Sequence, residues 1–590
     1  MKAHLFQPIY CCGLSIETRA ARGTYPNHLG YPLDEPRFLR YTPVHSGTMP
    51  DAGRIGAHHH LLDSNEGERA MATQRPISSV DVVLTTGEPR PLGRPDPDIP
   101  FRMLIMGDFS GRENRHHRAE HRAPTNRRPI RVDRDNIREL LGELSVAIEC
   151  PLLGDGTPPI TLRFADLDDF HPDRLVRQIE PLQKLSDLRR RLTNPATFPA
   201  AADEVRAWTQ PRQPTEAQSG TTGSPPHQAG VTGAPTTGLL DQVLEQAPIS
   251  VADLRPTEWQ SYLQSLIQPL LVPKEHPMEK ELVAQVDAAM TQILRTVLHH
   301  PTFQRLEAAW RGLSFLVDRV ETDGQLQLSL LDLPKSALSA DLLHRDDLQT
   351  TQLYRLLVEE TVRIPGAHPW AVIGGIYTFD RTSNDVELLE RIAKVSQEAG
   401  APFLAAAAPR ITGCSSFGAA PDPDAWQDPA KQQEDHQWWQ HLRQMNEASF
   451  LGLSLPRFLL RLPFGRETEA ISACAFEEMT GVPDHEDYCW GNPIFACLAL
   501  LGQAFSEDGW HLRPGSVQDI DGLPLHVYQD ETGESVTKPC AEAWLTEKAA
   551  EVLLEQGLMP LLSYKNQDRL RLVRFQSIAS PLKPLQGRWS

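Results

Sequence analysis

The clearest pattern of apolar and polar positions lies in residues 299–317, HHPTFQRLEAAWRGLSFLV. This stretch places an apolar side chain every three or four residues, which predicts a helix that buries one wide face. His300-Pro301 predicts the start of the helix, because a proline in the first turn loses no hydrogen bond. The pattern leaves open whether the face belongs to a core or to an interface. The apolar positions are Phe303, Leu306, Trp310, Leu313, Leu316 and Val317.

Residues 76–210 show a mixed pattern of strands and helices. Residues 101–106 form an apolar run short enough for a buried strand, and the turn sequence GDFSGR follows at residues 107–112. Asp135-Asn136 predicts the start of a helix, and residues 160–164 predict a second strand. One leucine-rich helix is predicted further on, with apolar positions at Leu175, Ile179, Leu182, Leu185, Leu188 and Leu192.

A further strand is predicted ahead of the strand at residues 101–106, in a segment where apolar residues partly alternate with Ser, Asp and Thr. A Gly/Pro-rich break separates it from the next predicted strand. We expect this segment to pair with a sheet edge in a neighbouring subunit. Its apolar positions are Ile77, Val80, Val82 and Leu84.

Residues 211–238 are predicted to be a flexible linker, because they contain Gly and Pro throughout and almost nothing to bury. A flexible coil of that length averages roughly 30 Å end to end. Residues 239–246, LLDQVLEQ, then form a short amphipathic pattern. Such a helix either docks on its own domain or serves as a peptide that a partner recognises. Its apolar residues are Leu239, Leu240, Val243 and Leu244.

The C-terminal half alternates strands with helices. Residues 369–380 and 401–409 predict strands, and Asn384-Asp385 predicts the cap of the helix between them. This order is typical of a parallel sheet unit. The fold class predicted is therefore α/β, with two α/β domains at residues 76–210 and 239–590 joined by the linker.

The composition of the chain disfavours several classes of protein. The chain has 590 residues, a net charge of -19 and a pI of about 5.6, which disfavours a whole-protein nucleic-acid binder. Eight cysteines without a CxxC pair suit a reducing cytosol. No apolar run is long enough to span a bilayer, and the N-terminus lacks a secretory signal pattern.

Few residues carry a chemical signature, so we expect no catalytic, cofactor-binding or metal site. The GxxxxGK[ST] phosphate loop is absent from the sequence. The best metal-like cluster is Asp484, His485, Asp487 and Cys489, but neighbouring loop residues rarely converge on one ion. Solvation or a structural hydrogen bond explains the cluster better. The tract His58, His59 and His60 is likewise interpreted as solvated.

Residues 112–134 contain eight arginines and three acidic residues. A nucleic-acid patch is one interpretation, but interleaved aromatic residues are missing. Pairing with an acidic neighbouring subunit is the more economical interpretation.

Several strings resemble the type VI secretion contractile sheath. Residues 299–317 and LGLSLPRFLLRLPFG at residues 451–465 resemble its large subunit (TssC or VipB, the EvpB family). GDFSGR at residues 107–112, RPIRVDRDN at 128–136 and LDDFHPDRLVRQI at 167–179 resemble its small subunit (TssB or VipA) in the same order. The resemblance covers about 120 residues of the first half and residues 238–580 of the second.

The resemblance implies a fused small and large sheath subunit, a structural protein and not an enzyme. It would assemble around an inner tube in the bacterial cytoplasm and contract to drive effector delivery. Implied partners are further copies or other sheath subunits, the inner tube protein, baseplate components and an AAA+ recycling unfoldase. The unfoldase would grip Leu239, Leu240, Val243 and Leu244. Neither nucleic acid nor direct membrane insertion is implied.

The two ends of the chain depart from the family. Residues 1–75 lack periodicity and are expected to be disordered or a non-native extension. The sequence stops at GRWS, where family members usually continue with terminal strands that help to join subunits. An alternative function is therefore a non-polymerising sheath paralogue that caps or regulates assembly.

Overall fold

The computed structural model describes five stretches of the chain: residues 95–115, 128–151, 159–209, 279–426 and 433–590. We call residues 95–209 the N-terminal part and residues 279–590 the C-terminal part. The predicted N-terminal extension and linker lie outside the described residues. So do the predicted inter-subunit strand (Ile77, Val80, Val82, Leu84) and the amphipathic helix (Leu239, Leu240, Val243, Leu244).

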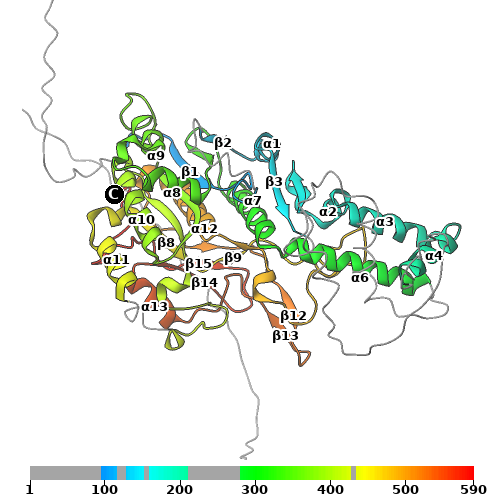
Figure 1. Cartoon of the computed structure of the whole chain (residues 1–590). Coiled ribbons are helices and arrows are strands. Elements are labelled where there is room, and N and C mark those ends of the chain that lie inside the picture. Colours follow the sequence, from blue (N-terminus) through cyan, green and yellow to red (C-terminus); the bar gives the residue numbers. More distant parts are fainter. Residues whose placement is uncertain (1–94, 116–127, 152–158, 210–278, 427–432) are drawn as a thin grey trace, which may run out of the picture. The chain divides into compact units, whose positions relative to one another are not determined.

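Among the described residues, nine strands form one sheet that takes strands from both parts (Figure 1). From β8 to β5 all neighbours are parallel, as the strand–helix–strand pattern predicts, and the α/β fold class is confirmed. In sheet order the strands are β11 (Asp519–Ile520), β15 (Leu570–Leu572), β14 (Met559–Ser563), β8 (Leu451–Leu455), β7 (Phe403–Ala407), β6 (Val372–Phe379), β1 (Phe101–Gly107), β5 (Leu326–Asp332) and β2 (Ile130–Val132).

Three two-stranded ribbons accompany this sheet. They are β3–β4 (Val146–Cys150 and Ile160–Phe164), β9–β10 (Phe458–Leu459 and Trp490–Gly491) and β12–β13 (Val527–Gln529 and Ser535–Thr537). The helices of the N-terminal part are α1 (Ile137–Glu143), α2 (Pro172–Gln178), α3 (Glu180–Leu192) and α4 (Phe198–Thr209). Those of the C-terminal part are α6 (Glu279–Leu298), α7 (Pro301–Arg319), α8 (Lys335–Leu343), α9 (Gln352–Tyr354), α10 (Ser383–Ala399), α11 (Gln433–Gln444), α12 (Ile494–Asp508) and α13 (Glu547–Glu555).

Helices cover both faces of the sheet, so β1 is buried on both sides. Phe101, Met103 and Ile105 share a core with the apolar faces of α7 and α12. Leu104 and Met106 share the opposite core with α8 and α10. Successive side chains of a strand point to opposite faces, which is why β1 is apolar at every position from Met103 to Met106.

The helix predicted from residues 299–317 is α7, and its predicted buried residues are buried. The ring of His300 caps its N-terminus by accepting the Thr302 backbone N–H at 3.3 Å. Close packing against α12 requires a glycine, because a Cβ at Gly312 would stand 2.2 Å from the ring of Phe495.

Two local predictions are wrong in detail. The leucine-rich helix is broken into α2 and α3, because Ile179 is extended and Pro181 in the following first turn has no N–H to continue the ladder. The cap of α10 is Thr382, whose side chain accepts from the backbone of Asp385. Asp385 therefore lies in the first turn, where it accepts the N–H of Asp380 and pairs with Lys335.

We expect Gly312→Ala to lower the free energy of unfolding by about 1–3 kcal/mol, because the added methyl displaces the ring of Phe495. Thermal unfolding of the full chain measures this effect. Gly142→Ala in α1 is the matched control, since nothing lies within 4 Å of its Cβ position. That control should be neutral or gain about 0.4–1 kcal/mol. Equal melting temperatures for the two variants would contradict the close packing of α7 against α12.

Candidate functional interface

A carboxylate of the C-terminal part binds the GDFSGR turn of the N-terminal part. Asp332, at the end of β5, accepts the backbone N–H groups of Phe109 and Ser110 at 3.0 Å each. It also accepts the Ser110 hydroxyl at 2.8 Å, and Arg112 lies 3.5 Å away. The Asp332 side chain is 5% exposed, so this anion is held by hydrogen bonds and not by water. The turn therefore joins the two parts of the chain.

Helix α7 supplies the second contact with this turn. The indole N–H of Trp310 donates to the carbonyl of Phe109 at 2.8 Å, and the two rings meet edge to face at 5.6 Å. The buried face of α7 therefore belongs both to a core and to an interface. The helix packs in the core of the C-terminal part and also contacts the N-terminal part.

Two polar contacts join the parts further from the sheet. Asp173 of α2 accepts the Ser472 and Ala473 backbone N–H groups at 2.9 Å each, and the Ser472 hydroxyl at 2.8 Å. Burial alone would raise the pKa of Asp173, but the hydrogen bonds from Ser472 outweigh it and lower the pKa. Arg189 of α3 pairs with the nearly buried Asp287 of α6 at 2.5 Å.

A buried network of charges fixes α7 to the loop that follows β9. Arg461 lies between Glu307 and Glu478, with Nε 2.7 Å from Glu307 and Nη1 2.7 Å from Glu478. Burial raises the pKa of each carboxyl, but Arg461 outweighs burial and holds both below their ordinary values, that of Glu478 at about 2. Arg311 also pairs with Glu307, and Phe464 donates its N–H to Glu478. Every charge in the network thus has a partner.

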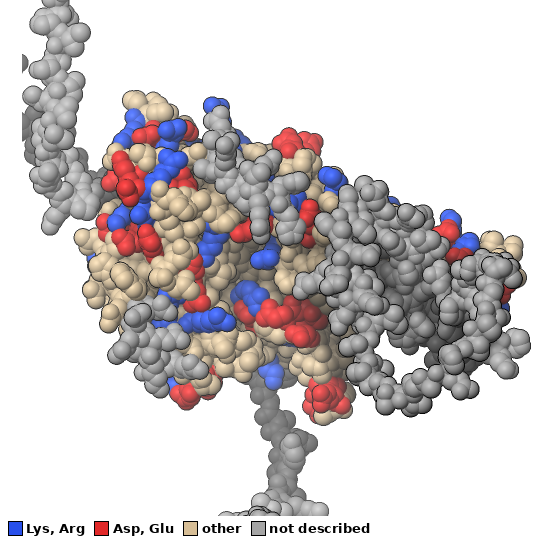
Figure 2. Space-filling view, in the orientation of Figure 1, with Lys and Arg blue, Asp and Glu red and all other residues tan. Residues whose placement is uncertain are grey.

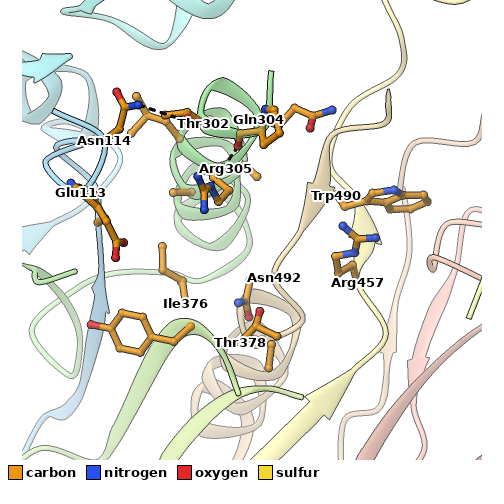
Figure 3. A pocket seen from close by; sticks show the side chains of 18 of the residues that line it. Glu113, Asn114, Thr302, Gln304, Arg305, Ile376, Thr378, Arg457, Trp490 and Asn492 are labelled. Atoms are coloured by element: carbon orange, nitrogen blue, oxygen red, sulfur yellow. Dashed lines mark hydrogen bonds between the residues drawn. The ribbon is translucent and has the colours of Figure 1, made fainter. Parts of the chain in front are cut away.

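A cavity of 730 Å³ opens at the carboxyl ends of β1, β6 and β7 (Figure 3). Its walls come from both parts, since Glu113 beside the GDFSGR turn and Arg305 of α7 both line it. Arg457, beside Trp490, is already paired with Glu486 at 3.1 Å and with Glu542 at 2.6 Å. At the end of the cavity near Trp490, the charged side chains of Arg457, Glu486 and Glu542 are therefore paired with one another.

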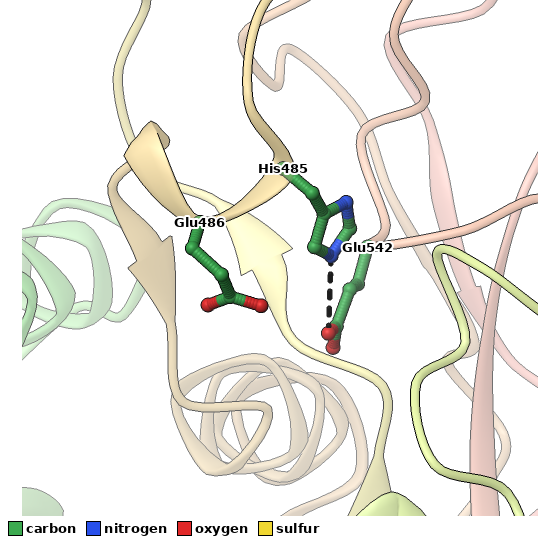
Figure 4. A group of neighbouring side chains, drawn as sticks. All are labelled: His485, Glu486 and Glu542. Atoms are coloured by element: carbon green, nitrogen blue, oxygen red, sulfur yellow. Dashed lines mark hydrogen bonds and ion pairs between the residues drawn. The ribbon is translucent and has the colours of Figure 1, made fainter.

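His485, Glu486 and Glu542 form a compact polar group (Figure 4). The two ring nitrogens of His485 lie 3.3 Å from Glu542 and 3.0 Å from Lys538 Nζ. Burial raises the pKa of Glu542, but hydrogen bonds from His485 and Arg457 outweigh it and bring the pKa to about 2. Arg457 pairs with both carboxylates of this group, and Lys538 contacts its histidine, so each member of the group has a structural partner.

The four residues of the predicted metal-like cluster do not converge. Asp484 accepts the backbone N–H of Glu486, and Asp487 pairs with His299 at 3.1 Å. Cys489 is buried, and burial raises the pKa of its thiol. Only His485 joins the polar group, and its carboxylate partner Glu542 is 57 residues away in sequence, which local spacing could not reveal.

The arginine-rich stretch contacts the C-terminal part of the same chain. Arg131 donates to the carbonyl of Asp323 at 2.8 Å, and Arg134 lies 4.0 Å from the carboxylate of Asp318. On the described surface that Figure 2 draws, Lys and Arg side chains are interspersed with Asp and Glu side chains. No described helix has the length and apolar character needed to cross a membrane.

We expect Glu478→Gln to destabilise the chain by roughly 3 kcal/mol at pH 7, because a pKa of about 2 against the ordinary 4.5 corresponds to that free energy. A lowered pKa stabilises the fold fully above pH 4.5, and this stabilisation is lost as the pH falls toward 2. The difference between wild type and variant should therefore shrink over that range, as measured by urea unfolding followed by tryptophan fluorescence. Glu531→Gln, at an exposed position, is the control. A constant difference from pH 7 to pH 3 would contradict this prediction.

Both parts of the chain match known families. The family model described as EvpB/VC_A0108, tail sheath N-terminal domain, matches residues 280–579. The family model described as Type VI secretion system, VipA, VC_A0107 or Hcp2, matches residues 94–204.

Two curated relatives come from Pseudomonas aeruginosa. The type VI secretion system sheath protein TssC1 is 33% identical over 309 residues, which cover 51% of this chain and 61% of the relative. The sheath protein TssB1 is 31% identical over 105 residues, or 17% of this chain and 58% of the relative. The chain thus spans about three-fifths of the length of each relative. The resemblance inferred from the motifs is confirmed for both parts, and the chain belongs to the EvpB/VC_A0108 tail sheath family, with a VipA-like part ahead of it in the same polypeptide.

Proposed function

We propose that the protein is a structural subunit of the type VI secretion contractile sheath, with the small and large subunits fused in one chain. The observation that carries this proposal is the shared sheet. The TssB-like part supplies β1, which lies between β5 and β6 of the TssC-like part. Such a chain has a fixed one-to-one ratio of the two parts.

The proposed mechanism is mechanical. Copies stack around an inner tube in an extended state and then slide into a shorter packing of lower free energy, which delivers effectors. Assembly of this kind is heterologous and grows as a helix. A subunit that transmits force must not come apart internally, and the contacts of Asp332 and Arg461 serve that requirement.

The proposed partners follow from the same role. They are further copies or other sheath subunits, the inner tube protein, baseplate components and an AAA+ unfoldase that recycles the sheath. The proposed location is the bacterial cytoplasm. We include two contact segments in the proposal: the strand with Ile77, Val80, Val82 and Leu84 between subunits, and the helix with Leu239, Leu240, Val243 and Leu244 for the unfoldase.

Electron microscopy of the purified full chain, alone and co-expressed with an ordinary large sheath subunit, tests the assembly. We expect ordered rings or tubes. Deleting residues 77–85 should abolish these assemblies and leave a folded monomer, because the deleted strand joins copies through backbone hydrogen bonds. Sedimentation and circular dichroism separate loss of assembly from loss of folding. Failure to assemble in both preparations would contradict the sheath role, and unchanged sedimentation after the deletion would contradict the role of the strand.

We expect Leu240→Asp with Leu244→Asp to remove binding to the sheath unfoldase without changing the melting temperature. The reason is that a recognition helix exposes its apolar stripe to the partner and buries little in its own chain. Pull-down with the unfoldase and thermal unfolding are the two measurements. Gln242→Asp with Gln246→Asp adds the same charge on the polar side and is the control. A loss of several kcal/mol in stability would show instead that the helix belongs to the core.

A further inference from the structure

The C-terminal part contains a slot in its sheet that only a strand from outside this part fills. β1 pairs with β5 over seven residues, from Phe101 opposite Leu326 to Gly107 opposite Asp332. On its other side it pairs with β6, from Met103 opposite Val372 to Met106 opposite Gly375. Without β1, the facing edges of β5 and β6 would both be left unpaired in the interior of the sheet.

The contacts that hold the N-terminal part in place do not depend on chain continuity. Asp332 binds Ser110, and Trp310 binds Phe109. Asp173 binds the backbone of Ser472, and Arg189 pairs with Asp287. Each contact joins a residue before 210 to a residue after 278. An N-terminal part from another copy would make every one of them equally well.

The covalent connection is long compared with what the fold requires. Helix α4 ends at Thr209 and packs beside α6, which begins at Glu279, so the two ends to be joined belong to neighbouring helices. The chain between them has 69 residues. Covalent geometry allows such a length to span at most roughly 250 Å. The connection therefore permits the N-terminal part to reach the sheet of an adjacent copy.

We propose that the slot between β5 and β6 accepts the N-terminal part of a second copy of this chain, so that copies exchange these parts when they are crowded together. In dilute solution the connection holds a chain's own N-terminal part at an effective concentration on the order of millimolar or below, and the closed single chain prevails. Between copies in contact, the exchanged arrangement has the same contacts and a similar local concentration. This proposal does not rest on the sheath role, since it concerns any two copies held close together.

Charge reversal at the contact between Arg189 and Asp287 tests the exchange. The variants Arg189→Asp and Asp287→Arg each place like charges at this contact and should each lower the melting temperature. When the two full-length variants are co-expressed with different tags, exchange restores opposite charges at both contacts. We expect a mixed complex with one copy of each variant and a melting temperature that returns toward that of wild type.

The control is a single chain that carries both substitutions and so tests whether the reversed pair is tolerated within one copy. If this control folds but the co-expressed variants give no mixed complex, the proposal is overturned. Native mass spectrometry after purification through both tags in succession identifies the complex.

A second variant keeps the test decisive if the reversed pair does not fold. Asp173→Cys with Ser472→Cys places two thiols where the side-chain oxygens now lie 2.8 Å apart. After oxidation of concentrated protein, exchange gives disulfide-linked dimers on a non-reducing gel, and the dimer fraction falls on dilution before oxidation. Disulfides formed only within single chains at every concentration would overturn the proposal. The two single cysteine variants control for links through the native cysteines.

Discussion

The position of β1 between β5 and β6 is the constraint on which the rest of the structure depends. This strand is buried on both faces and hydrogen-bonded on both edges. The turn after it is held by Asp332, whose carboxylate would lose the hydrogen bonds from Phe109 and Ser110 if the turn moved away. The cores on both sides of the sheet are therefore complete only when both parts of the chain are present.

Buried charges set the geometry around this sheet. Arg461 lies between two buried glutamates, and the half-buried Arg457 joins the buried Glu542 to the exposed Glu486. Such networks contribute little net stability, because desolvation offsets most of the attraction between the charges. They do penalise every arrangement that separates the partners. A rigid subunit with one internal packing is the expected result.

Much of the local structure could be predicted from the sequence, because it depends on short-range pattern. The apolar spacing around Trp310 predicts α7, and the runs at β6 and β7 predict a parallel pair. The break at Pro181 was missed, since the leucine period continues across it. Sheet order could not be predicted, because the place of β1 is decided by partners far along the chain. One feature of the sequence could have indicated the buried ion pair near the interface. Glu307 and Arg461 are charged residues that lie inside apolar segments.

The central position of a strand made so early affects the order of folding. Ser110 and its partner Asp332 are 222 residues apart in sequence, so β1 leaves the ribosome long before β5 and β6 exist. During that interval its apolar side chains and both of its edges have no native partners, a state that favours aggregation and slow, non-local folding. Two separate subunits can each fold partly before they meet. A single polypeptide must instead keep β1 unpaired until most of the chain has been synthesised, which makes protection of the nascent chain a requirement of this architecture.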